Sequence, residues 1–186
     1  MANKIKYGLR NVYYAKATEG AGGVLSYGTP VAIPGAVNLS LSAEGDDNPF
    51  YADDVVYFRT IANNGYSGSL EIALIPESFK TDILGEVADD DGVLVENAST
   101  IPAEFALLFE FQGDESATRH GLLRCTCSRP DVNGATKEAS IEPQTETLNL
   151  TVMPRINDQL VKMRCAYGNA EYNGWFTAVH APTFTP

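Results

Sequence analysis

Two segments of alternating apolar and polar residues, separated by a long acidic stretch, constrain this chain more than any other feature. In residues 37–42 and again in residues 69–74, every second side chain is apolar, which predicts strands with one buried and one solvated face. The apolar face of the first strand comprises Val37, Leu39 and Leu41. Residues 55–58 are strand-like too, and Asn63-Asn64-Gly65 is typical of a hairpin turn. The region predicts a half-exposed antiparallel sheet.

The acidic stretch, residues 43–54, is too long for an ordinary hairpin connection of about two to five residues. It holds Phe50 and Tyr51, two large rings that are costly to expose in an isolated loop. We therefore expect a protruding loop with a partner for these rings. The alternative is a loop folded back on its own domain, with the rings closing one end of the sheet system.

Other segments extend the β pattern. Residues 105–111 are apolar on both faces, as in a central strand, and residues 118–128 read as their antiparallel partner, with Leu123, Cys125 and Cys127 on one face and Leu122 on the other. Strands are also predicted at residues 146–152, 160–166 and 174–179, with Trp175-Phe176 in the core, and a polar loop at 129–143. One short helix is predicted over residues 76–84 by Pro76 at its start and Gly85 at its end. We expect a mainly β chain of about eight to ten strands and one helix.

Composition limits the classes of function. The chain has 186 residues and a net charge of −11, which disfavours an electrostatic grip on nucleic acid. Its length fits one domain, residues 1–186, and it has neither a secretory leader nor an apolar run long enough to cross a membrane. The three cysteines are too few for a disulfide scaffold and are interpreted as buried thiols.

The sequence contains no complete catalytic or metal-binding motif. His120 and His180 lack a nucleophile elbow beside them, and the Asp89–Gly92 region lacks calcium ligands at the required positions. The carboxylate pairs Asp46-Asp47 and Asp53-Asp54 have no identifiable partner for glycoside chemistry. We therefore predict no catalytic residues, no metal site and no cofactor.

Several segments together carry a resemblance to a known family: residues 12–15, 31–37, 48–53, 64–68, 105–111, 140–147 and 175–176. They resemble the major tail proteins of long-tailed bacteriophages of Gram-positive bacteria. The resemblance implies a tube-forming β-sandwich with a flanking helix, whose subunits join as hexameric rings and stack into a hollow, non-contractile tail. DNA and the tape-measure protein would pass through the lumen, and tail terminator and distal tail proteins would lie at the ends.

The resemblance also implies a structural virion protein of the tail, made in the cytoplasm of the bacterial host, with no enzymatic activity and no membrane partner. Some relatives append an immunoglobulin-like domain after the tube domain. Here we expect one tail-tube domain and no appended one.

On this basis we assign two candidate surfaces. The first is an assembly loop that reaches a neighbouring subunit or the next ring: Glu44, Asp46, Asp47, Asn48, Pro49, Phe50, Tyr51, Asp53 and Asp54. The second is a polar strand face that lines the lumen, where like charge keeps DNA from binding. Its members alternate with core residues: Ser40, Ser42, Ser69, Glu71, Thr147, Asn149 and Thr151.

Two other classes stay open. A carbohydrate-binding or adhesin-type sandwich would group exposed aromatic rings in a groove, and Tyr51, Tyr57, Tyr66 and Tyr172 are the candidates. A polysaccharide hydrolase would depend on Asp53 or Asp54.

Overall fold

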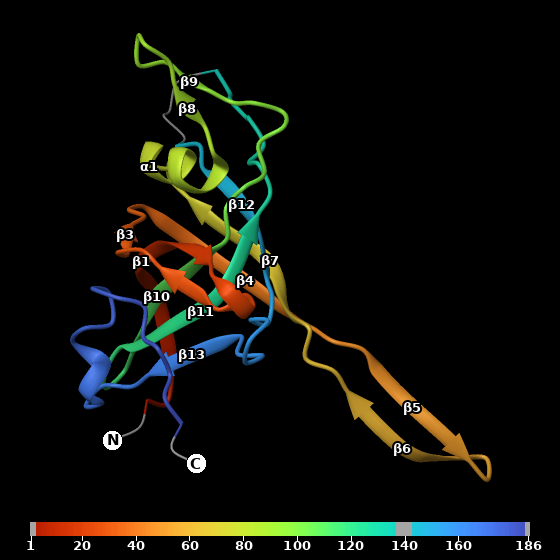
Figure 1. The fold of residues 1–186 in the computed structure, drawn as a ribbon. Coiled ribbons are helices and arrows are strands. Elements are labelled where there is room, and N and C mark those ends of the chain that lie inside the picture. Colours follow the sequence, from red (N-terminus) through yellow and green to blue (C-terminus); the bar gives the residue numbers. More distant parts are fainter. Residues whose placement is uncertain (1–2, 137–142, 185–186) are drawn as a thin grey trace.

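The computed structural model describes residues 3–136 and 143–184. It is mainly β, and antiparallel strands form a nine-stranded sheet in the order β2-β1-β10-β11-β12-β7-β4, with β13 added beside β11 and β3 beside β1 (Figure 1). The strands of this sheet are β1 (Lys6–Glu19), β2 (Leu25–Tyr27), β3 (Val31–Ala32), β4 (Ala36–Glu44), β7 (Gly65–Ile72), β10 (Phe105–Gly113), β11 (Thr118–Cys127), β12 (Glu146–Val152) and β13 (Lys162–Cys165).

The sheet folds into two layers because β11 pairs with different strands along its length. Its first half, from Arg119 to Leu122, pairs with β13, and its second half, from Cys125 to Cys127, pairs with β12. One layer therefore contains β1, β10 and β13, and the other contains β12, β7 and β4. Apolar side chains from both layers share a single buried cluster. The arrangement is consistent with the expected β-sandwich.

The predicted helix closes one end of the sandwich. It consists of α1 (Glu77–Phe79) and a wider π-type turn, η2 (Lys80–Leu84), and it ends at Gly85, whose positive φ of 76° suits glycine. The ring of Phe79 meets the rings of Tyr14 and Phe105 edge to face at 5.0 and 5.5 Å between centroids. The helix is thus fixed to the body through aromatic packing.

Strand β10 is buried on both faces, as its sequence predicts. One face lies in the main core, and the other is covered by the C-terminal segment, where Tyr172 and Trp175 form a second buried cluster with Cys165. The segment contains the short 3₁₀ helix η3 (Ala170–Tyr172), turns follow as far as residue 177, and no residue from 174 to 179 is in a strand. The strand predicted at 174–179 is therefore wrong, although Trp175 is buried as expected. Another 3₁₀ turn, η1 (Ala21–Gly23), links β1 to β2.

Two register shifts overturn the predicted faces of individual residues. In β4, the shift between Ala36 and Asn38 leaves Val37 exposed, while Leu39 and Leu41 pack against the core. In β11, the shift opposite Phe105 and Leu107 places Leu122, rather than Leu123, in the main core with the two cysteines that follow. A bulge adds one residue to a strand and so reverses the alternation beyond it.

The stretch predicted as a protruding loop is one strand of a hairpin. Strand β5 (Asp47–Ala52) pairs with β6 (Val55–Ile61), and the two extend from the body as an arm (Figure 1). We call residues 45–64 the arm. The assignment of Asn63-Asn64-Gly65 as a hairpin turn was wrong: β6 and β7 do not pair, and these residues join the arm to the body. The hairpin turn lies instead at Asp53-Asp54.

A smaller hairpin, β8 (Val87–Ala88) with β9 (Leu94–Val95), projects beyond the helix at the opposite end of the molecule (Figure 1). Of the predicted polar loop at 129–143, residues 137–142 lie outside the described residues. No helix in the described part of the chain is long and apolar enough to cross a membrane.

Candidate functional site

The arm is a continuation of two body strands. Strands β4 and β7 pair as far as Glu44 and Gly65, and hydrogen bonds continue outward from the Asn64 N–H to the Glu44 carbonyl (2.9 Å) and from the Ala62 N–H to the Asp46 carbonyl (3.0 Å). At Gly45 a Cβ atom would lie 2.0 Å from the Ala62 carbonyl oxygen, so only glycine fits there. This close backbone approach fixes where the arm leaves the body.

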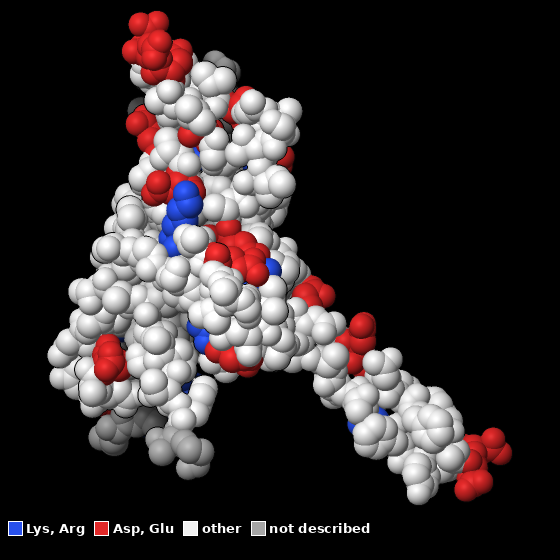
Figure 2. All heavy atoms as spheres, viewed as in Figure 1, with Lys and Arg blue, Asp and Glu red and all other residues white. Residues whose placement is uncertain are grey.

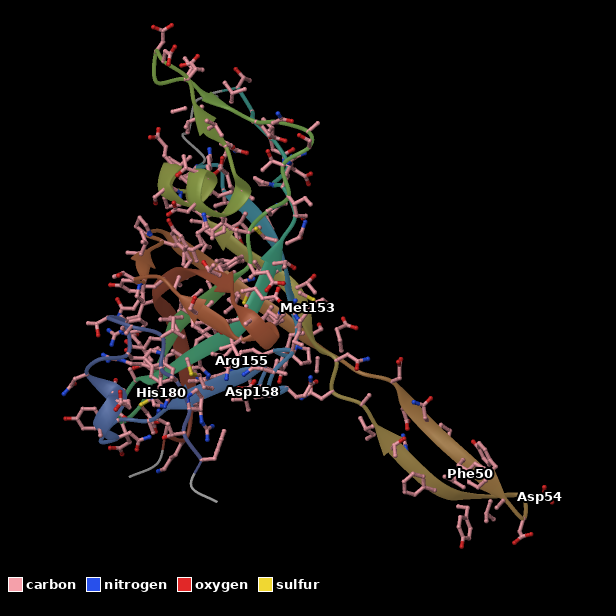
Figure 3. All side chains as sticks on the ribbon, in the orientation of Figure 1. Phe50, Asp54, Met153, Arg155, Asp158 and His180 are labelled. Atoms are coloured by element: carbon pink, nitrogen blue, oxygen red, sulfur yellow. The ribbon has the colours of Figure 1, made fainter. Side chains whose placement is uncertain are left out.

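The arm exposes apolar side chains on both strands. The rings of Phe50 and Tyr51 are 60% and 62% exposed, and Tyr57 is 74% exposed. Register places Phe50 opposite Phe58 and Tyr51 opposite Val56. The folded-back alternative is therefore wrong for this chain, since the rings do not close the sandwich. Figure 3 shows Phe50 near the far end of the arm, away from the body.

The tip of the arm is acidic and has an unusual backbone. Asp53 and Asp54 both have positive φ, 52° and 61°, as a two-residue type I′ turn requires. Glycine or asparagine adopts this conformation more readily than aspartate. Figure 2 shows acidic side chains gathered at this tip and at the far end of the β8–β9 hairpin. The chain thus places two negative charges where Asn-Gly would make an easier turn.

The rest of the predicted loop lies along the arm and its base. Asp47 accepts a hydrogen bond from Arg59 Nε at 2.7 Å, which links β5 to β6. Glu44, at the end of β4, accepts a hydrogen bond from the Ser67 hydroxyl. The sequence missed the second half of the arm, although the apolar run at residues 55–58 was a signal for it.

The seven residues predicted to line a lumen share one face of the β12, β7 and β4 layer. The register forms rows across β12, β7 and β4. Thr147 lies beside Glu71, Asn149 and Ser40 lie on either side of Ser69, and Thr151 and Ser42 lie on either side of Ser67. None of the seven is buried. Asn38, Ser67 and Thr126 extend the same face. We call this surface the polar face.

Hydroxyl and amide groups dominate the polar face. Glu71 is the one carboxylate among the seven predicted residues, and its Oε1 accepts a hydrogen bond from the Thr145 hydroxyl at 2.7 Å. None of the seven is a lysine or arginine. The face can therefore contact water and neutral groups freely but has little attraction for a polyanion.

A groove opens between the two layers on the apolar side of β4. Its walls include Leu39, Leu41, Phe109 and Phe111, and its rim carries Lys6 and Lys162. We call it the rim-lysine groove. The Lys6 Nζ lies 4.8 Å from the centroid of the Phe111 ring.

His120 lies inside the same groove and stacks on Phe109 at 5.3 Å between centroids. Burial, together with the positive charges of Arg164, Lys6 and Lys162, lowers the pKa of His120 to about 4. The ring is therefore neutral at pH 7. No sequence motif marks this cluster, because its members are distant along the chain.

One buried carboxylate supports the C-terminal segment. Glu110 is 1% exposed and accepts hydrogen bonds from Arg10 Nε at 2.6 Å and Arg119 Nε at 2.9 Å. The Arg119 guanidinium also lies over the rings of Tyr172 and Phe176, 3.8 and 4.9 Å from their centroids. This cluster is fully paired and structural.

The residues considered for other functions are dispersed. Tyr51 and Tyr57 lie on the arm, Tyr66 borders the groove and Tyr172 is buried, so they do not line one carbohydrate groove. The three cysteines are buried and unlinked, as predicted, and burial raises the pKa of Cys127 to about 12. In residues 3–136 and 143–184, no group of three or more His, Cys, Asp or Glu side chains is arranged to hold a metal ion.

Comparison with protein families decides between the remaining classes. Residues 2–115 match the family model described as phage tail tube protein. The chain belongs to this family. The comparison with curated proteins returned no match.

The matched range of this tail tube protein contains the helix, the whole arm and two strands of the polar face, β4 and β7. Strands β11, β12 and β13 and the C-terminal segment lie beyond it. The family is structural rather than a known enzyme class, and it places the protein in the virion tail, where it assembles with other tail components into a tube.

Proposed function

We propose that this tail tube protein polymerises as stacked, hexameric rings and that the resulting tube is the conduit for DNA. The observation that carries the proposal, beside the family, is the arm. An isolated two-stranded hairpin is marginally stable in water, and this one exposes aromatic rings along its length. Burial of those rings against other copies would stabilise the hairpin and remove the apolar rings from water.

Ring formation fits an interface of this kind. An arm that binds a different surface on the next copy, without that copy's arm returning to the first, makes a heterologous contact. Heterologous contacts that close on themselves make rings. The arm of one subunit then reaches a neighbour in the ring or in the next ring, through the residues predicted from the sequence and through β6.

The polar face is the surface we assign to the lumen. Its hydroxyl and amide groups, together with the net charge of −11, give passing DNA no cluster of cations to bind. The tape-measure protein would occupy the same lumen before DNA. Tail terminator and distal tail proteins would contact the exposed ends of the tube.

Electron microscopy of the purified protein tests the proposal. We expect a soluble monomer or small oligomer that polymerises once nucleated, and negative stain should show stacked rings with a central hole. A dimer that never polymerises, alone or with tail-tip components, would contradict it.

The lumen assignment has a separate test. Glu71→Lys combined with Asn149→Lys places positive charge on the polar face and should slow DNA ejection while tubes remain intact. The same pair of substitutions at Asp90 and Asp91, on the β8–β9 turn, is the matched control. Unchanged ejection from normal particles would show that another face lines the lumen.

A further inference from the structure

The rim-lysine groove is an apolar, positively charged surface that the subunit itself leaves open. Leu39 and Leu41 face Phe109 and Phe111 across it. Leu39, Leu41 and Phe111 are only partly buried, and Phe109, which is 4% exposed, forms the floor between them and the core. Open apolar surface bordered by charge is typical of a site for another protein segment.

The positive charge at this groove is not balanced within the subunit. Lys6 and Lys162 line the groove, and Arg164 on β13 lies beside it as the ladder partner of His120. No carboxylate of the described residues lies within ion-pair distance of any of these three cations. In a chain with a net charge of −11, such a cluster is the place where an acidic partner gains most.

The lysines are held in position by the groove itself. Lys162 Nζ donates a hydrogen bond to the Tyr66 hydroxyl at 2.7 Å and lies 4.6 Å from the centroid of that ring. Lys6 lies over Phe111 in the same way. Both ammonium groups therefore lie beside the apolar walls while the lysine residues stay exposed, so a bound segment would meet charge and apolar surface together.

The tip of the arm has the complementary chemistry. It carries Asp53 and Asp54 directly beside the exposed rings of Phe50, Tyr51 and Tyr57. The nearest cation along the arm, Arg59, is already paired with Asp47. The tip is thus both acidic and aromatic, as an occupant of the groove must be.

The arm cannot fill the groove of its own subunit. Figure 3 shows Phe50 and Asp54 at the far end of a hairpin that runs away from the body. The hydrogen-bonded base at Glu44 and Gly65 and the close approach at Gly45 fix that direction. Only a second copy of this chain can therefore bring an arm tip to the groove.

We propose that the rim-lysine groove of one subunit is the docking site for the arm tip of another, with Asp53 and Asp54 against Lys6, Lys162 and Arg164 and the arm's aromatic rings against the groove walls. The inference rests on the proposed assembly into a tube and adds the receiving surface. It explains why two aspartates occupy a turn that asparagine and glycine would form more readily.

A charge exchange tests the proposal. Asp53→Lys with Asp54→Lys, or Lys6→Glu with Lys162→Glu and Arg164→Glu, should each reduce the yield of sedimentable tubes by about tenfold or more, because like charges then meet. Combining all five substitutions in one chain should restore most of that yield. Matched controls are Asp90→Lys with Asp91→Lys and Lys16→Glu with Lys80→Glu, which should leave the yield unchanged.

The outcomes separate the two proposals. If either set of substitutions assembles like the unaltered protein, or if the folded combination does not recover, the groove is not the docking site. Tubes formed by the unaltered protein would still support the proposed assembly. If the unaltered protein forms no tubes under nucleating conditions, the proposed assembly itself fails.

A cross-linking experiment keeps the proposal testable even if a charge variant misfolds. A photoreactive phenylalanine analogue at Tyr57, which is 74% exposed, is placed in otherwise unaltered protein and assembled with isotopically labelled copies. We expect cross-links between copies that map to β13, β4 or the start of β1. Cross-links that map to the helix or to the β8–β9 hairpin would overturn the assignment.

Discussion

The hairpins β10–β11 and β5–β6 have similar apolar content but opposite surroundings. In β10, the run from Phe105 to Glu110 is buried without a break, whereas every residue of β6, from Val55 to Ile61, is exposed. Both are antiparallel pairs rich in aromatic and aliphatic side chains. The difference teaches that apolar character alone does not place a strand in the core of its own subunit.

The two hairpins should therefore respond differently to the same substitution. Removing a side chain from β10–β11 should destabilise the subunit, and removing one from β5–β6 should impair assembly alone.

The largest loss of stability is expected for Phe105→Ala. Phe105 is fully buried and packs against Phe79, so its truncation should lower the free energy of unfolding by about 3–5 kcal/mol, as for other large-to-small core changes. Phe58→Ala in the arm is the matched control and should cost about 0.5 kcal/mol or less. Urea unfolding of both variants measures the difference. Equal losses would contradict the contrast between the hairpins.

A smaller loss is expected for Glu110→Ala. Without the carboxylate, Arg119 is left largely buried and unpaired, while Arg10, which is 50% exposed, can return to water. We expect a loss of about 3 kcal/mol, at the low end for breaking a buried ion pair. Fluorescence of Trp175, the only tryptophan, should also change because Arg119 stacks on the C-terminal segment. A fully stable variant with unchanged fluorescence would show that the cluster does not hold that segment.

The body should also lose stability in mild acid through His120. Its pKa of about 4 in the folded chain lies below the ordinary value of 6.5, so between these pH values the unfolded chain binds a proton that the folded chain excludes. Stability should therefore fall as the pH drops from 6.5 toward 4. The difference in unfolding free energy between the protein and His120→Asn should shrink over that range. A constant difference would mean that the histidine is not shielded from protonation.

The smallest effect on stability, and the largest on assembly, is expected for Phe50→Ala with Tyr51→Ala. Both rings are exposed in the isolated subunit, so the melting temperature should be almost unchanged, while tubes should be lost. Calorimetry and negative-stain microscopy measure the two results. A loss on the order of 3 kcal/mol in the monomer would mean that the rings pack on their own domain.

Much of the fold follows from local pattern. The alternation in residues 146–152 predicts which side chains of β12 are buried, and Leu148, Leu150 and Val152 are the ones found in the core. The run of β10 that is apolar on both faces correctly predicted a central strand. The proline before the helix and the glycine after it correctly predicted where the helix begins and ends. Such signals are local, because side-chain direction in a strand follows directly from residue number.

The sequence did not reveal the β-bulges or which strands pair with each other. The register shifts in β4 and β11 place Val37 and Leu123 on the face opposite to the predicted one. No residue type in either strand indicates where these shifts occur. The acidic stretch was recognised as protruding, but the pairing of β5 with β6 was not, because Asn63-Asn64-Gly65 gave a stronger turn signal than Asp53-Asp54.

The sequence by itself determined the mainly β class, the alternating polar face and the presence of an acidic, aromatic segment with no obvious partner in the chain. Only the tertiary structure decided that this segment is one strand of a projecting hairpin and that Lys6 and Lys162 meet at one groove. The physical reason is distance along the chain. Alternation is set by neighbouring residues, whereas the groove is made by strands as distant along the chain as β1 and β13, which the folded sheet brings together.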